Sequence, residues 1–527
     1  MYTDRNGIAD LSVFKDTDIL AFNHLSYIEF EIMKRELAVV EYVIHLARRA
    51  EQLDEVVLSA SRGEEKRSRI AEQVAVTSVE EIKRMAPQTA ADLLAALPGI
   101  RVQKSQFGGG SPVLRGMEAN RVLLVVDGVR MNNAIYRMGH LQNSITVSPN
   151  ILSRTEVIFG PSSVIYGSDA LGGVVHYYTK TPKISEKNQY QGSVFARYSS
   201  ANDEFTKEGN LEINTPKWAS FTSISHSKFG DLRMGKNRNH DYKDWGKVFE
   251  YSNNSDNYFA DSAVPNDDPD IQKNTGYDQI DLLQKITSPV KEKNELVFNF
   301  QYSQSSDIDR FDKLTEYSDN ALKFAEWHYG PQKRLLLSSR YAFSPESKWM
   351  QNGTLTAAYQ KINESRIQRN FGSLNRTYRD ESVDVLSLNA DFFVPLTEDE
   401  KRILSYGFEI THNDVTSEAV GKTLEVYHNT VVGFSDEFDV QSRYPDGGSD
   451  YSSLAAYLNY RQDISRNSTL NTGLRLVRTV LNATWNNETF IQLPENDITL
   501  RNAAVTATAG YAYKPGNDWQ VNAVIAS

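Results

Sequence analysis

The sequence predicts a mainly β protein, a transmembrane antiparallel β-barrel with about 13 strands present, preceded by an α+β domain and a small β domain. Two observations favour this class. Beyond residue 187, segments of about ten residues alternate apolar and polar side chains, as strands do when they separate lipid from a wet lumen. Short turns also alternate with long polar loops there, which a soluble β-sandwich has no reason to do.

The composition limits the alternatives. The chain has 527 residues, more than one ordinary core accommodates, and no apolar run of about 18 residues, so a membrane-spanning helix is excluded. The 11% aromatic content fits the interfacial belts of a barrel, although composition alone leaves a large soluble β protein open. A net charge of −11 argues against a nucleic-acid partner, and the absence of cysteine excludes disulfides and thiolate metal sites.

Residues 1–52 are expected to form short strands, because apolar residues recur at Ile8, Leu11 and Val13, in DILAFNHLSY and in AVVEYVIHLA. This stretch resembles the later part of the carboxypeptidase-regulatory-like domain that precedes many outer-membrane receptors of Bacteroidetes-type bacteria. An unrelated β appendage is the alternative. The first residues contain no secretion signal, so we expect the start of an exported protein to be missing.

Residues 53–69 read as a linker in which two acids precede apolar residues. An extended peptide of this kind can add itself as a strand to the sheet edge of another protein. The segment resembles the TonB box of TonB-dependent receptors, which implies a TonB-type energy-transducing protein as partner at the periplasmic face. Any linker strand could show this pattern, so the assignment as a TonB box rests on the position of the segment directly before the next domain. The implied coupling residues are Asp54, Glu55, Val56, Val57 and Leu58.

The next block, residues 70–182, begins with two short helices. Ser78 and Glu81 form a capping box for a helix that ends before Pro87. Thr89 caps a second helix, ADLLAAL, which Pro98 and the following glycine end. The spacing of the leucines gives this second helix an apolar face.

Three strands are expected in the rest of this block. Val122–Val126 is uniformly apolar and reads as a buried strand, and Asp127 with Gly128 turns it into a hairpin. Residues 156–159 and Gly173–Thr179 form two further β-type runs, separated by a loop that several glycines and a proline interrupt.

Four motifs in this block, DLLAALPGI, VLRG, RVLLVVDGVRM and GPSSVIYGSDALGGVVHYYTK, resemble the plug domain of TonB-dependent receptors in order and approximate spacing. The resemblance implies a plug at residues 70–182 inside the first part of a barrel at residues 187–527, in the outer membrane of a Gram-negative, Bacteroidetes-like cell. It implies energised uptake of a bulky, scarce nutrient, with an iron–siderophore or haem complex as the first choice. Cobalamin or another metal complex is the second choice, and a non-transporting surface ligand-binding protein the third.

An enzymatic function finds no support in the sequence. The glycine-rich stretches lack the lysine of a P-loop and the spacing of a dinucleotide-binding turn. Neither a G-x-S-x-G elbow nor an H-E-x-x-H motif occurs. These absences predict no catalytic residue and no cofactor. The acidic run NDDPD lacks EF-hand spacing, so we also predict no specific metal site.

Two positions concern how the plug is held. Relatives commonly carry an arginine before the Gly-Pro of the last motif, and with the arginine of the L-R-G motif it pairs with barrel carboxylates. Here Arg115 is present, but Phe159 stands at the other position. The resemblance therefore implies an ion pair from Arg115 to the barrel, with Phe159 packed against apolar barrel residues in place of the second pair.

The polar stretch MNNAIYRMGHLQN corresponds to the plug tip, where the resemblance places ligand contacts. A loop that merely faces the lumen is the alternative. An exposed histidine here could ligate a haem iron or bind a chelate oxygen. The implied ligand-binding residues are Tyr136, Arg137, His140, Gln142 and Asn143.

The alternating strands are clearest in YQGSVFARY, ELVFNFQYS and AVTATAGYAY, whose aromatic and aliphatic residues share one face. Short turns are expected at NTPKW, SPVKEKN, SPESKW, PLTEDEK, DISRNS and KPGNDW, and long loops at 228–276, 304–333, 361–379 and 413–450. Plugged transporters close with about 22 strands, so we expect a fragment that lacks about nine. Side chains in the loops that could grip a planar or catecholate ligand are Tyr242, Trp245, His240, Trp327, His328, Tyr329 and His428.

Overall fold

The computed structural model describes residues 8–24, 27–46, 56–59, 63, 65–104, 107–136, 144–238, 241–291, 293–345, 347, 349–516 and 519–527. The chain divides into two compact units, Met1–Val56 and Val57–Ser527. Within the described ranges, no helix is both long enough and apolar enough to cross a membrane.

The first unit contains a single hairpin among its described residues. Strand β1 (Ile19–His24) pairs antiparallel with β2 (Tyr27–Met33), as the run DILAFNHLSY predicts. The expectation of strands at Ile8, Leu11 and Val13 and in AVVEYVIHLA is wrong, because the first three lie outside any strand and the latter begins inside the 3-10 helix η1 (Lys34–Val40). The backbone amides of Glu41 and Tyr42 donate to the carbonyls of the last turn of this helix. The segment is therefore not extended and cannot pair as a strand.

The second unit begins with the plug, and both predicted capping boxes are confirmed. At α1 (Val79–Met85) the Glu81 amide donates to Ser78 Oγ, and the Ser78 amide donates to the Glu81 carboxylate at 2.8 Å. Thr89 and Asp92 do the same at α2 (Ala90–Ala95). Each box satisfies backbone donors that a helix start otherwise leaves unpaired.

The plug sheet has the order β5 (Gln73–Ser78), β10 (Leu152–Phe159), β11 (Gly173–Thr179), β8 (Val122–Val126) and β9 (Val129–Arg130). A second small sheet pairs β6 (Ile100–Gln103) with β7 (Ser111–Leu114). Strand β8 is buried along its whole length, and the predicted Asp127-Gly128 hairpin is present. Gly173 is required at the start of β11, since its φ is 147° and a Cβ there would lie 2.2 Å from the Ile158 carbonyl oxygen.

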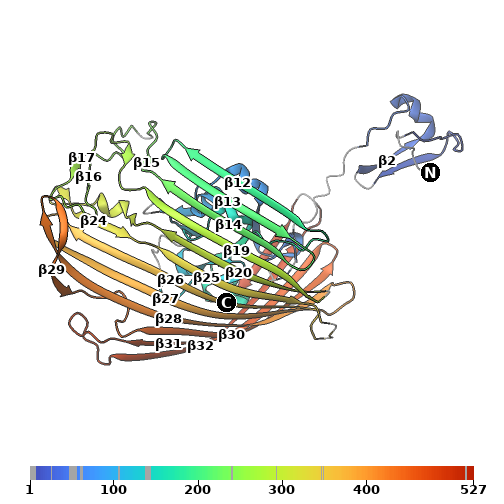
Figure 1. Ribbon diagram of the computed structural model, residues 1–527. Helices are drawn as coiled ribbons and strands as arrows, with labels where there is room; N and C mark the ends of the chain where they lie inside the picture. Colours follow the sequence, from blue (N-terminus) through green and yellow to red (C-terminus); the bar gives the residue numbers. More distant parts are fainter. Residues whose placement is uncertain are drawn as a thin grey trace. The chain divides into compact units, whose positions relative to one another are not determined.

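Beyond the plug, 13 described strands pair consecutively and antiparallel, which confirms the predicted number. Figure 1 shows them side by side in one curved sheet, which we call the wall, with the plug elements on its concave side. In order they are β12 (Gln189–Ser199), β13 (Glu204–Asn214), β14 (Ala219–Phe229), β19 (Tyr277–Lys291), β20 (Asn294–Ser305), β25 (Lys333–Phe343), β26 (Asn352–Asn370), β27 (Asn375–Pro395), β28 (Arg402–Tyr427), β30 (Ser449–Ser465), β31 (Ser468–Thr484), β32 (Asp497–Tyr513) and β33 (Val521–Ala526).

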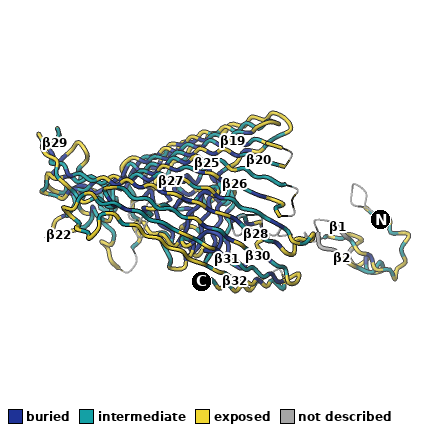
Figure 2. Tube along the Cα trace, turned by 90° about the horizontal axis from the view of Figure 1, so that it is seen from below, coloured by how far each residue is buried: buried dark blue, intermediate teal, exposed yellow. Residues whose placement is uncertain are grey.

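The two faces of the wall differ as the alternation predicts. On β20, Phe298 and Phe300 are exposed on the outer face, whereas Asn299 and Gln301 are buried toward the plug. Figure 2 shows the same contrast along the strands, with buried residues gathered in and against the plug. The outer face is therefore the one that contacts lipid.

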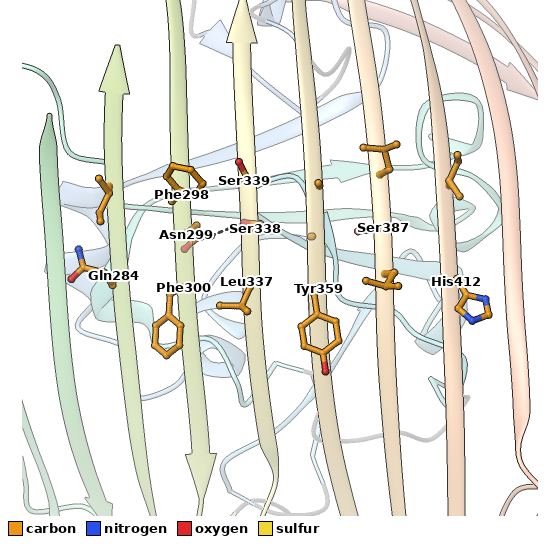
Figure 3. Close-up of a pocket in the computed structure, with 16 residues that line it drawn as sticks. Gln284, Phe298, Asn299, Phe300, Leu337, Ser338, Ser339, Tyr359, Ser387 and His412 are labelled. Carbon is orange, nitrogen blue, oxygen red and sulfur yellow. Dashed lines mark hydrogen bonds between the residues drawn. The ribbon is translucent and has the colours of Figure 1, made fainter. Parts of the chain in front are cut away.

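An apolar depression of about 850 Å³ lies on this outer face, across β19 to β28 (Figure 3). Outward side chains such as Phe298, Phe300 and Leu337 line it, and they point away from the plug. Because it opens where acyl chains contact a barrel, we assign it to the lipid-facing surface and not to ligand binding.

The six predicted short turns are confirmed, and two of the four predicted long loops are wrong. The expected loop 361–379 is mostly strand, since β26 runs to Asn370 and β27 starts at Asn375. The expected loop 413–450 is largely β28 and β29 (Thr430–Asp439). These polar stretches still bury one apolar face, with Ile362, Val383 and Val415 against the plug tip, and that packing keeps the hairpins extended.

The other two long connections are confirmed and carry small elements of their own. Residues 230–276 contain β15 (Leu232–Arg233) paired with β18 (Ile271–Gln272), and β16 (Glu250–Tyr251) paired with β17 (Val264–Pro265). Residues 306–332 contain β21 (Ile308–Asp309), α4 (Phe311–Leu314), β22 (Tyr317–Ser318), β23 (Ala321–Leu322) and β24 (Phe324–Tyr329). Strand β24 pairs with both β21 and the far end of β26.

Candidate functional site

The segment that carries the predicted coupling residues is docked on the plug at its described end. Val57 is fully buried in a plug cluster, and Tyr166 Oη donates to the Ser59 carbonyl at 2.8 Å. The carboxylate of Glu156, on β10, accepts from the backbone amides of Leu58 at 3.1 Å and Ser59 at 2.8 Å. Glu156 is itself fully buried, and Arg154 pairs with it. A buried anion therefore holds the chain at the last residue of the predicted TonB box and at the residue after it.

A second group of charges joins the plug to the wall. Arg130, at the end of β9, pairs with Asp169 of the plug at 2.7 Å and with Glu409 of β28 at 3.1 Å. Glu409 also pairs with Arg475 of β31 at 3.0 Å, and Arg475 donates to the Ile165 carbonyl. We call Arg130, Asp169, Glu409 and Arg475 the plug–wall ion cluster. Its two positive and two negative charges compensate one another, with Glu409 and Arg475 buried and Arg130 and Asp169 partly exposed.

The β8–β9 turn forms another joint with the wall. One Asp127 carboxylate oxygen lies 3.0 Å from Lys285 Nζ, and the other accepts from Gln301 at 2.9 Å. The same carboxylate also accepts from the amide and hydroxyl of Thr179. The positive φ of Asp127 and of Gly128 makes the tight turn that presents this carboxylate.

A third joint lies at the start of the plug. Glu65 pairs with Arg461 at 2.5 Å, and Arg69 pairs with Asp463 at 3.0 Å. Asp463 stands at the β30–β31 connection, one of the short turns that face the periplasm in outer-membrane barrels. Burial raises the pKa of the Glu65 carboxyl, although Arg461 and Arg69 act in the opposite direction. The start of the plug therefore lies at the short-turn end of the wall.

The two residues expected to hold the plug in place have other surroundings. Arg115 is exposed and donates to Gln73 of the plug at 3.0 Å, and no ion pair of Arg115 occurs among the described residues. Phe159 is buried in the cluster that joins the plug core to Leu336 and Ala358 of the wall, with its ring 3.4 Å from a Cβ built on Gly99. The holding role of Arg115 and Phe159 stays a prediction.

The plug tip is anchored to the wall at its described end. The Ala134 amide donates to Asn413 at 3.1 Å, and Tyr444 Oη donates to the Ile135 carbonyl at 2.9 Å. Ile135 is buried against the wall, and Tyr136, partly buried beside it, is the one predicted ligand residue in the described ranges. Burial raises the pKa of the Tyr136 hydroxyl well above its ordinary value, so this group stays protonated. Of the remaining predicted residues, Asp54, Glu55, Arg137, His140, Gln142 and Asn143 lie outside the described residues.

Comparison with known proteins agrees with this arrangement. Residues 66–174 match the family profile described as TonB-dependent Receptor Plug Domain. The chain therefore contains a TonB-dependent receptor plug domain, and we refer to it as the receptor. The match begins at the plug start held by Arg461 and ends at β11. The receptor is an outer-membrane protein, as its wall of lipid-facing strands requires.

The receptor is similar to a protein of Vibrio vulnificus (strain CMCP6) named vitamin B12 transporter BtuB, at 26% identity over 377 residues that cover 69% of the chain and 53% of the relative. The chain thus spans about half the length of that relative. Among solved structures, the FrpB iron transporter from Neisseria meningitidis superposes with a TM-score of 0.62 at 14% identity, over 86% of this chain and 63% of that one. The ferric citrate transporter FecA gives 0.61 at 15%, over 87% and 63%.

The sequence analysis missed the residues that make the plug–wall contacts. Asp127 and Arg130 lie in a recognised motif but were interpreted only as parts of a hairpin. Glu156 is the only acid on β10, and a carboxylate on a strand expected to be buried is a signal for a specific partner. Glu409 and Arg475 had a comparable signal, because each points inward on an otherwise alternating strand.

We predict that Glu156→Gln frees the segment at Leu58 and Ser59. Hydrogen bonds to a charged group contribute about 1.5–3 kcal/mol, so hydrogen exchange of these two amides should accelerate roughly 10-fold to 100-fold. Glu80→Gln changes an exposed glutamate on α1 and serves as the control. Equal exchange in the two variants would contradict the assignment.

We also predict that Glu409→Ala loosens the plug by about 3–5 kcal/mol, because it leaves the buried Arg475 and the partly buried Arg130 without their shared carboxylate. Urea titration of the full-length receptor, followed by proteolysis of the released plug, measures this. Arg115→Ala changes an exposed side chain and should cost within about 0.5 kcal/mol. If Arg115→Ala destabilised the plug more than Glu409→Ala did, Arg115 and not Glu409 would make the main ion pair that holds the plug.

Proposed function

We propose that this receptor takes up a bulky metal complex across the outer membrane when a TonB-type protein pulls on residues 54–58 from the periplasm. The ligand binds from the side of the long connections, and the plug then rearranges to let it pass. The work consists of binding and force-driven displacement, with no chemistry on the ligand. The partner protein, the ligand and the coupling residues all belong to this proposal.

The observation that carries the proposal is the way the plug is held. The plug–wall ion cluster and the joints at Asp127 and Glu65 are polar contacts, which water can replace at a net cost of about 1.5–3 kcal/mol for each hydrogen bond to a charged group. A directed pull can therefore open a path without exposing a large apolar core. The docked Leu58 is the last residue of the proposed TonB box and Ser59 follows it, so the pull has a defined point of application.

We infer an iron–siderophore or haem complex as the ligand, because exposed aromatic side chains on the β14–β19 connection, Tyr242 and Trp245, suit a large planar or catecholate molecule. Structural relatives named as iron and ferric citrate transporters are compatible with this class. Cobalamin is the second candidate, and the observation that favours it is the similarity to a protein named vitamin B12 transporter.

Deleting residues 54–59 from the full-length receptor should abolish uptake and leave ligand binding at the cell surface intact. The deletion removes the segment that the TonB-type protein would pull and leaves the ligand-binding surface in place. Uptake and binding of radiolabelled ligand by whole cells measure the two separately. Deletion of residues 47–52, equal in length and just upstream, is the control and should retain both. Undiminished uptake after the first deletion would refute energy coupling through this segment.

A strain that lacks the receptor should lose growth when siderophore-bound iron or haem is the limiting nutrient, and growth should return when the wild-type gene is restored. Loss of growth on limiting cobalamin alone would establish the second candidate instead. Normal growth on all three sources would contradict uptake of either class of metal complex.

A further inference from the structure

Two long connections of the wall meet at a small group of metal-binding side chains. Asp256 belongs to the β14–β19 connection, whereas Asp307 and His328 belong to the β20–β25 connection. One donor atom from each residue lies within 4.8 Å of the other two. Three residues from separate segments therefore converge on one point, at the end of the wall that bears the long connections and faces the cell exterior in such barrels.

The histidine of this group has an unsatisfied nitrogen that faces the acids. His328 is 8% exposed, and its Nδ1 is buried without a hydrogen-bond partner among the described residues. The nearest acidic oxygen, Asp307 Oδ2, lies 3.7 Å away, which is beyond hydrogen-bond distance. A buried polar atom without a partner costs free energy, so a ligand that this nitrogen can bind would be stabilising.

The acids of the group are only weakly neutralised by protein cations. Arg376 Nη1 lies 4.0 Å from the Asp256 carboxylate, but the same guanidinium donates to Glu326 at 2.6 Å. Arg310, the arginine next to β21, pairs with Asp312 at 2.8 Å. The group thus retains negative charge that a cation between Asp256 and Asp307 would neutralise.

The spacing suits a metal ion after a small movement. For three atoms at most 4.8 Å apart, a central ion lies at most about 2.8 Å from each. Zinc binds imidazole nitrogen and carboxylate oxygen at about 2.0–2.2 Å, so a closure of less than about 1 Å suffices. Asp256 and Asp307 are exposed and can rotate that far, whereas the buried His328 fixes the position.

We propose that Asp256, Asp307 and His328 form a binding site for a divalent transition-metal ion, represented by Zn²⁺, that fastens the two connections together. One imidazole and two carboxylates form a donor set that suits Zn²⁺ and leaves a fourth position for water. Calcium takes six to eight oxygen ligands and gains little from the imidazole. The ion would order the outer mouth of the wall on the side of β14 to β25, independently of which nutrient is transported.

The test uses the full-length receptor in detergent, stripped of metal with a chelator and titrated with ZnCl₂ by calorimetry. His328→Asn and Asp256→Asn should each remove one bound Zn²⁺ per chain or weaken its binding at least 10-fold to 100-fold, the cost of losing even an outer-shell partner. Zn²⁺ should also slow hydrogen exchange around Asp256 and Asp307 in the wild type, and in neither variant.

His226→Asn is the matched control, because His226 Nε2 lies 3.8 Å from Asp278 Oδ1 in a similar pair outside the proposed site. It should bind Zn²⁺ as the wild type does. Heat-modifiable migration on gels confirms that each barrel is folded, and Asp256 is exposed, so its replacement tests the site without disturbing packing. Equal Zn²⁺ stoichiometry and affinity in wild type and His328→Asn, or binding of Ca²⁺ but not Zn²⁺ at this site, would overturn the proposal.

Discussion

The sharing of the Glu409 carboxylate between Arg130 of the plug and Arg475 of the wall is the interaction on which the arrangement of this receptor depends. Alternation along the wall strands places apolar residues toward lipid and polar residues toward the lumen. A domain inside such a lumen finds few apolar partners, so it has to be held largely by ion pairs and hydrogen bonds. Because Glu409 and Arg475 are buried and the four charges balance, either of these two is costly to remove singly.

The same contacts connect the docked segment to the wall. Tyr166 accepts from Arg130 through its carbonyl and donates to Ser59 through its hydroxyl. Ile165, its neighbour, accepts from Arg475. A force on Ser59 therefore acts on a residue that also touches the plug–wall ion cluster. This contiguity is geometric, and it gives the proposed pull a short physical route to the contacts it has to break.

The departure at Phe159 fits this picture. With phenylalanine where the family resemblance leads us to expect arginine, the end of β10 is apolar and packs against the Gly99 turn and the plug core. The described charge contacts with the wall come instead from the β8–β9 hairpin and from the start of the plug. Strand β10 therefore does two things. Its Phe159 end packs in the plug core, and Glu156 near its middle holds the segment at Ser59.

The sequence by itself determined the local structure: the capping boxes at Ser78 and Thr89, the buried strand Val122–Val126, the short turns and the alternation of 13 wall strands. These follow from periodicity and from backbone preferences that act over a few residues. Tertiary structure alone decided which charges meet, since Arg130 and Glu409 are 279 positions apart and Ser59 and Glu156 are 97 apart. Such pairs depend on the register of distant strands, which no local pattern encodes. The polar hairpin ends of β26 to β28 were mistaken for loops for the same reason, because their burial against the plug tip exists only in the folded chain.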